Sequence, residues 1–262
     1  MKCALQMKAD CCYYCHPTTG LQRRAIAAIG QELAHISRRE VVNPVPLKEE
    51  ELLYIRRGHE ALTKALDIVE DKNGWKTELT EVNGDVIYSK VSGDRKVFRL
   101  ETVLDATPEE IHHILWKVEE MHQWNPSIKN IKVLKQAGPE TMVTHEVSAE
   151  TAGNLIGQRD FLSVRHFSRQ ESCIYLGGAA THLESFPPQK SFVRAEDGPT
   201  CIVIEPLADD TGRSHFTWLL NMDVKGWLPK SIVNQALPRA QVDFTRCLRR
   251  RLAEGPTQQV AC

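Results

Sequence analysis

The sequence LPKSIVNQALPRAQVDFTRCLRRRLAE runs from Leu228 to Glu254, close to the C-terminus. Pro229 stands where a helix can begin, because the first residues of a helix need no intrahelical partner for their N–H groups. Apolar residues then recur at helical spacing and share one face: Val233, Ala236, Leu237, Ala240, Phe244, Cys247, Leu248 and Leu252. A face this apolar must be buried, so the stretch predicts a long C-terminal helix that covers another part of the chain.

The segments before this helix have the pattern of strands. Asn83-Gly84 is a hairpin turn between WKTELTEV and DVIYSKV, and KVFRLETVL follows the next turn. About six further strand-like runs lie near 129–135, 141–149, 159–168, 173–181, 191–206 and 214–222. Many clustered strands with few helices predict an α+β fold with an antiparallel sheet.

Two more helices are expected. One begins at the acidic residues 49–51, which suit the positive end of a helix dipole, and ends before the turn at 72–74. The other begins after the capping box at 107–110 and continues as one helix, EEIHHILWKVEEMHQW, to Trp124. Pro126 then prevents its continuation.

Composition excludes several classes of protein. The 262 residues are 42 % hydrophobic and 26 % charged, as in an ordinary soluble globular domain. A net charge of −1 argues against a nucleic-acid partner, and no apolar run approaches the roughly 18 residues that a membrane span needs. The eight cysteines have no framework spacing, so we expect free thiols.

Catalytic signatures are absent from the sequence. It contains no nucleophile elbow, metalloprotease, dinucleotide-binding or phosphate-loop motif, and the adjacent His112 and His113 cannot both face one metal. We therefore expect no enzyme, no metal and no cofactor. The alternative of a different class is an enzyme that uses the carboxylates of Glu146 and Glu150.

The first forty residues form a segment of their own. From Leu21 they become a basic amphipathic helix, which is typical of a mitochondrial presequence. CYYCH, from Cys12 to His16, matches the pattern of covalent haem attachment, but no compact haem-sized domain surrounds it. We interpret residues 1–40 as a mitochondrial presequence and residues 41–48 as a linker.

Seven long motifs, in order, carry a resemblance to a known family. They are NGDVIYSKV, KVFRLETVLD, QWNPSIKNIKVL, THEVSAETAGNLIGQRDFLSVR, RAEDGPTCIVIEPL, TWLLNMDVKGWLPKSIVNQAL and QVDFTRCLRRRLAE. Together they resemble the START domain family over residues 47–254, and within it the steroidogenic member. We assign residues 49–254 to this lipid-binding domain and residues 255–262 to a tail.

The resemblance implies a fold and a function. The family's helix-grip fold is a curved antiparallel sheet whose long C-terminal helix closes an internal hydrophobic tunnel. The tunnel binds one sterol, and the steroidogenic member promotes cholesterol delivery to the inner mitochondrial membrane for steroid hormone synthesis. The implied partners are cholesterol or a related sterol and the outer mitochondrial membrane surface, and the implied location is the mitochondrion, with import following.

The motifs also carry over a candidate ligand site. Arg165 lies in line with Phe161 and Phe167 on one face of a predicted strand, which is an unusual place for a charge. Glu146 and Arg165 match the family's buried acidic and basic pair at the sterol end of the tunnel. Paired, they offer hydrogen bonds to a sterol hydroxyl, and the alternative is that they only brace two strands.

The final helix is expected to serve as the tunnel lid. Its lid residues are Val233, Leu237, Phe244 and Leu248, and its basic end offers Arg249 and Arg250 to anionic lipid. Pro238 interrupts the family pattern and predicts a kink. This departure, and the acids and cysteines of residues 1–15, favour a divergent paralogue. We expect the chain to act as a monomer.

One alternative stays within the same class of function. The chain would then be a cytosolic carrier of another sterol, a steroid or a carotenoid. The sequence does not rank these ligands, because a methyl or hydroxyl difference changes the fit by only about 1–3 kcal/mol.

Overall fold

The computed structural model describes residues 47–150 and 157–255. Its elements are α2 (Glu49–Glu70), β1 (Lys76–Thr80), β2 (Val86–Ser92), β3 (Arg95–Leu104), α3 (Pro108–Trp116), a 3-10 turn η1 (Val118–Glu120), α4 (Met121–Trp124), β4 (Ile128–Gln136), β5 (Thr141–Ser148), β6 (Arg159–Gln170), β7 (Cys173–Ala180), β8 (Val193–Asp197), β9 (Thr200–Pro206), β10 (Ser214–Leu220), β11 (Met222–Asp223) and α5 (Lys230–Ala253). The presequence, the CYYCH motif, most of the linker and most of the tail lie outside the described residues.

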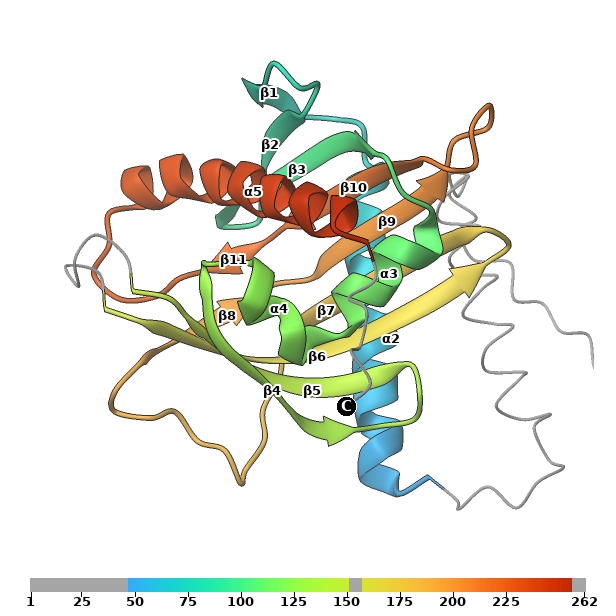
Figure 1. Ribbon diagram of the computed structural model, residues 1–262. Helices are drawn as coiled ribbons and strands as arrows, with labels where there is room; N and C mark the ends of the chain where they lie inside the picture. Colours follow the sequence, from blue (N-terminus) through green and yellow to red (C-terminus); the bar gives the residue numbers. More distant parts are fainter. Residues whose placement is uncertain (1–46, 151–156, 256–262) are drawn as a thin grey trace, which may run out of the picture.

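One curved sheet organises these elements (Figure 1). Nine strands follow one another in the order β1-β2-β3-β10-β9-β7-β6-β5-β4, and every neighbouring pair on this path is antiparallel. The short β8 lies parallel to the start of β6, and β11 pairs with β8. The predicted α+β class and antiparallel sheet are confirmed.

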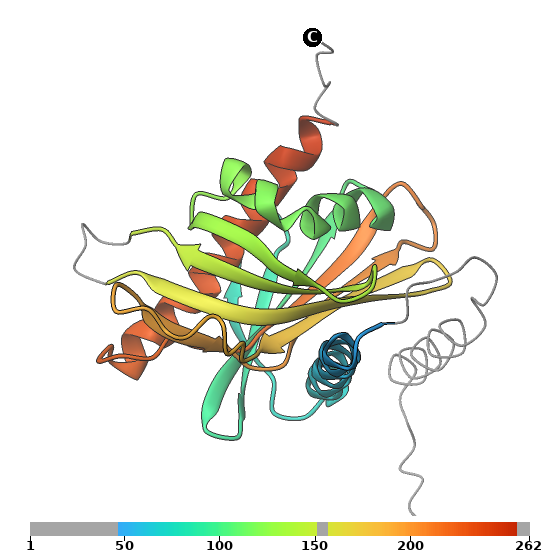
Figure 2. The ribbon, with the colours of Figure 1, turned by 90° about the horizontal axis from the view of Figure 1, so that it is seen from below.

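Helices cover both faces of the sheet (Figure 2). α2 lies on one face, which we call the outer face, while α3, α4 and α5 lie over the other, inner face. Gly177 on β7 allows the close approach of α2, because a Cβ at that position would lie 2.6 Å from the Cβ of Leu62. Leu62 is fully buried there, so α2 is a fixed part of the outer core.

α5 is the long helix that the C-terminal stretch predicts. It runs from Lys230 to Ala253 without interruption at Pro238, whose ring is itself buried. The buried stripe is narrower than predicted, because Ala236 and Ala240 are exposed. The buried residues of α5 are Leu237, Pro238, Gln241, Val242, Thr245 and Leu248. Small residues at the margin of an apolar face therefore misled the prediction.

The single helix expected to reach Trp124 is wrong. α3 ends at Trp116, Lys117 leaves the helical region with ψ at 63°, and the chain restarts as η1 and α4. The break lets Val118 and Met121 join the inner core beside β4 and α5. Tertiary packing thus overrides a continuous helical pattern.

Candidate functional site

A row of apolar side chains crosses the inner face in the middle of the sheet. Leu176 lies opposite Ile202, and Ile202 lies opposite Trp218, on the adjacent strands β7, β9 and β10. All three remain partly exposed, although they belong to central strands on the face that α5 covers. The other side chains of the inner face and of α5 therefore do not cover this row completely.

Aromatic rings contact this row on the helix side. Phe244 of α5 lies with its ring 4.8 Å from the ring of Trp218 and 5.5 Å from that of Trp124, measured between centroids. Such tilted contacts are favourable beyond the area they bury. They place α5, α4 and β10 around one apolar interior.

β6 places Arg165 toward the same interior. Leu162 and Val164 pack against residues of α2 in the outer core, so the alternate residues Phe161, Ser163 and Arg165 point to the inner face. The alternation along the strand predicted this division, and it holds. A charged residue in line with phenylalanines is therefore an inward-facing group.

Arg165 and Glu146 form an ion pair. Nη2 of Arg165 donates to Oε2 of Glu146 over 2.9 Å, and its Nε donates to Oγ1 of Thr144 over 3.0 Å. The side chain of Glu146 keeps 21 % of its exposure and that of Arg165 keeps 28 %. Both groups thus retain surface that a ligand can contact.

A second carboxylate, missed by the sequence analysis, lies in the same region. Oγ of Ser163 donates to Oδ2 of Asp197 over 2.7 Å, and Ser163 stands two positions before Arg165 on the same face of β6. We call Thr144, Glu146, Ser163, Arg165 and Asp197 the interior polar cluster. Burial raises the pKa of Glu146, and Asp197 raises it further, against the opposing effect of Arg165. Burial likewise raises the pKa of Asp197.

The four proposed lid residues all pack into the inner core. Leu237 and Leu248 are buried, and Val233 and Phe244 are partly buried against the same cluster. α5 thus presents an apolar surface to the partly exposed row on the sheet. Their role in closing a ligand site remains a proposal.

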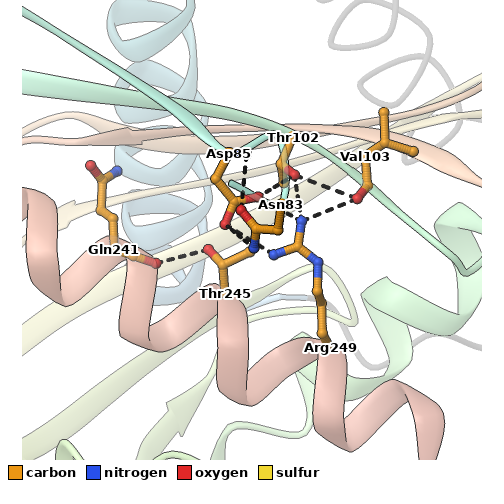
Figure 3. Close-up of polar contacts among 7 residues, drawn as sticks. All are labelled: Asn83, Asp85, Thr102, Val103, Gln241, Thr245 and Arg249. Carbon is orange, nitrogen blue, oxygen red and sulfur yellow. Dashed lines mark hydrogen bonds and ion pairs between the residues drawn. The ribbon is translucent and has the colours of Figure 1, made fainter. Parts of the chain in front are cut away.

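Arg249 does not point to solvent, contrary to its predicted role in membrane contact. Its guanidinium donates twice to the carboxylate of Asp85, over 2.6 and 2.9 Å, and once to Oγ1 of Thr102 over 2.6 Å (Figure 3). Thr102 in turn donates to Asp85 over 2.5 Å. We call Asp85, Thr102 and Arg249 the helix anchor, because they join α5 to β3 and to the turn before β2.

The negative charge of Asp85 is compensated by its partners in the helix anchor. Asp85 is only 1 % exposed, and burial alone would raise its pKa. Hydrogen bonds from Arg249 and Thr102 outweigh that effect and hold the pKa of Asp85 below its usual value. The charge of Asp85 is therefore fully compensated inside the protein.

The helical pattern contained a signal for this anchor. Gln241, Thr245 and Arg249 follow one another at intervals of four, beside Leu248, so they lie on the buried stripe. Gln241 donates to the backbone carbonyl of Trp218 over 3.1 Å. Arg250, the other predicted membrane contact, is exposed.

The structure also bears on the enzyme alternative and on the expectations about metals and membrane spans. Glu150 is exposed beyond the end of β5, whereas Glu146 points inward, so the two carboxylates of the enzyme alternative face different surroundings. No group of side chains in the described ranges 47–150 and 157–255 is arranged to hold a metal ion. Within those same ranges, no helix is long and apolar enough to cross a membrane.

Two solved human structures share the fold of this chain. Human StAR-related lipid transfer protein 5 matches with a TM-score of 0.72 at 21 % identity, over 78 % of this chain and 98 % of that one. Human STARD10 matches with a TM-score of 0.61 at 19 % identity, over 80 % of this chain and 82 % of that one. At these identities the likeness concerns the fold.

Several curated proteins are much more similar to this chain in sequence than these two structures are. Steroidogenic acute regulatory protein, mitochondrial, is 45 % identical in Ovis aries and 43 % identical in Homo sapiens, each over 93 % of both chains. The Danio rerio protein of the same name is 44 % identical over 90 % of both chains. The model of the START domain matches residues 55–256. With this match, and with relatives this similar over nearly their whole length, the chain belongs to the START domain family.

Proposed function

We propose that this chain binds one sterol, with cholesterol as the leading candidate, between α5 and the inner face of the sheet, and delivers it at mitochondria for steroid synthesis. The observation that carries the proposal is the partly exposed apolar row of Leu176, Ile202 and Trp218 beside the interior polar cluster. A sterol needs this combination: a large apolar surface to bury and one polar point to fix its direction.

The geometry assigns roles to the two parts of the interior. The apolar row and the lid residue Phe244 bury the sterol rings, each CH₂ contributing about 0.8 kcal/mol. The ion pair of Arg165 and Glu146 offers a donor and an acceptor to the hydroxyl at the other end, directly or through water. No bond is made or broken, so the chain acts as a carrier rather than an enzyme.

Entry and exit of the sterol require α5 to move. Its apolar stripe faces the interior, so a lifted helix would expose Leu237 and Leu248. Such a surface is favourable only against a membrane or a ligand. Arg250 and Arg246, both exposed on α5, are suited to anionic headgroups at roughly 1 kcal/mol each. Arg249 takes part only after the helix anchor has broken.

The test is a titration of the full chain with a fluorescent sterol that cholesterol displaces. We expect saturable one-to-one binding, and a loss of about tenfold or more in Glu146→Met and Arg165→Leu, because either change leaves a charge unpaired or removes the polar point. Arg246→Leu is the matched control, because Arg246 pairs with Asp243 on the exposed face of α5. Absence of displaceable binding by the folded wild type would refute the proposal.

Delivery at mitochondria is tested separately. The named relatives are mitochondrial proteins, and residues 1–40 have the basic amphipathic pattern of a presequence. We expect residues 1–40 to direct a fused fluorescent protein to mitochondria. A cytosolic fusion product, together with intact sterol binding, would favour the alternative of a cytosolic carrier of another sterol, a steroid or a carotenoid.

A further inference from the structure

The interior polar cluster contains more acid than base. Glu146 from β5 and Asp197 from the end of β8 both lie beside Arg165, which is the one cation of the cluster. Arg165 donates hydrogen bonds from Nη2 to Glu146 and from Nε to Thr144. Asp197 receives only the neutral hydroxyl of Ser163 as a hydrogen-bond donor among the described contacts.

Neighbouring charges do not correct this imbalance. The charged groups that act on Glu146 are Arg165 and Asp197, and the charged group that acts on Asp197 is Arg165. The adjacent Glu196 is occupied elsewhere, with Lys225 at 3.1 Å and Arg95 at 4.0 Å. If both carboxylates of the cluster were ionised, one negative charge would be left without a partner in an apolar interior, which is costly.

A proton is the simplest compensation for such a charge. Two carboxylates that share one site rarely ionise together, and one of them keeps its proton to higher pH. The raised pKa values of Glu146 and Asp197 agree with this expectation, and burial is the main cause in both. One proton on either Glu146 or Asp197 would balance the charge of the cluster.

We propose that Asp197 is a specificity-determining residue of the ligand site: with Glu146 it retains one shared proton at neutral pH and so presents a carboxylic acid donor to an acceptor oxygen of the ligand. This inference rests on the proposed function for its ligand, but the proton itself does not. A steroid with a keto group at its polar end accepts hydrogen bonds and cannot donate them, so a second donor beside Arg165 favours its binding. A hydroxyl does both, so a hydroxysterol binds in either protonation state.

Infrared difference spectroscopy of the ligand-free full chain tests the shared proton. We expect a carboxylic acid C=O band at pH 7 that weakens both in Asp197→Asn and in Glu146→Gln. Glu70→Gln is the control, because burial raises the pKa of Glu70 to about 7 and its own protonated fraction adds to the band. The proposal is overturned if all of the acid band disappears with Glu70→Gln, or if neither cluster substitution alters it. Thermal unfolding of each variant verifies its fold.

Competition experiments test the specificity. Cholesterol and cholest-4-en-3-one each displace a fluorescent sterol from the wild type and from Asp197→Asn, at pH 6 and at a pH above loss of the shared proton in the infrared titration. We expect the affinity for the ketone, relative to cholesterol, to fall about tenfold in the wild type on this rise in pH. It should stay constant in Asp197→Asn, whose amide donates at any pH.

Two results would count against the specificity role. A ratio that stays constant in the wild type refutes it, and so does a ratio that changes equally in Asp197→Asn. If neither steroid binds, the proposed function fails and the specificity role fails with it, while the infrared band still decides whether the proton is shared.

Discussion

The two arginine–carboxylate pairs beneath α5 differ in how completely they are satisfied. In the helix anchor, Asp85 is 1 % exposed, and Arg249 and Thr102 both donate to it. In the interior polar cluster, Glu146 and Arg165 keep 21 % and 28 % exposure, and a second carboxylate competes for the same cation. The pKa of Asp85 is lowered, whereas the pKa of Glu146 is raised.

This difference indicates that the two arginine–carboxylate pairs have different roles. A pair whose hydrogen bonds are all made within the protein, like that of Arg249 and Asp85, joins two elements and offers no polar group to a ligand. An incompletely balanced pair in an apolar interior is poor at stabilising the fold, so ligand binding is the role that suits it best. Substitutions in the two regions should therefore differ in their effects on stability and on ligand affinity.

Removal of the anchor carboxylate should have the largest effect on stability. We expect Asp85→Ala to lower the free energy of unfolding by about 3 kcal/mol, because Arg249 would lose its partner at a largely buried position. Urea denaturation measures the change. The control is Arg250→Ala, one residue away but exposed, which should change stability by less than about 0.5 kcal/mol. Equal effects of the two substitutions would mean that the helix anchor contributes no more to the free energy of unfolding than an exposed side chain does.

Two threonines give a matched comparison of the anchor and the cluster. Thr102→Val removes a hydroxyl that contacts both Asp85 and Arg249, and should cost about 2 kcal/mol in unfolding free energy. Thr144→Val removes one acceptor of Arg165 and should cost less than about 1 kcal/mol, because Arg165 can still bind water. Sterol affinity should fall in Thr144→Val more than in Thr102→Val. The reverse ranking in both measurements would contradict a stabilising role for the helix anchor and a ligand-binding role for the interior polar cluster.

The pH dependence of stability should have opposite signs in the two regions. The folded pKa of Asp85 lies below its unfolded value, so its contribution is present above the ordinary value of 3.8 and is lost as pH falls through the folded pKa. Glu146 and Asp197 have raised pKa values, so their contribution is complete below the ordinary values and is lost as pH rises through the folded ones.

Unfolding free energies across the pH range test these signs. Relative to the wild type, Asp85→Asn should flatten only the acid side of the profile, and Asp197→Asn only the side toward higher pH. We expect these to be the smallest of the three effects, because a protonated carboxyl can still accept hydrogen bonds from its neighbours. Flattening on the opposite side in either variant would show that the assignment is reversed.

Much of this architecture was predictable from local patterns. The runs near 141–149 and 159–168 correspond closely to β5 and β6, and the alternation in β6 placed Arg165 and Phe161 on one face, which in the structure is the inner face. Helical spacing likewise predicted α5 and the inward orientation of its lid residues. Periodicity succeeds here because each pattern needs only neighbours along the chain.

The failures share a different cause. Arg249 was assigned to the membrane because a run of arginines suggests a solvated face, yet its partner Asp85 lies 164 positions away in the sequence. Asp197 was overlooked because nothing near it in the chain marks it as an interior residue, and Ser163 is 34 positions away. The helical pattern is broken at Lys117, and beyond the break Val118 and Met121 are buried in the inner core.

Local sequence patterns specify most of the strands and helices, which residues of β6 share one face, and that a long amphipathic helix must cover another part of the chain. The tertiary contacts specify which face of β6 points inward, which arginine anchors α5 and how many carboxylates lie beside Arg165. The physical reason is that side-chain alternation is a property of the backbone's local geometry, whereas compensation of a buried charge depends on every group that folding brings within a few ångströms of it.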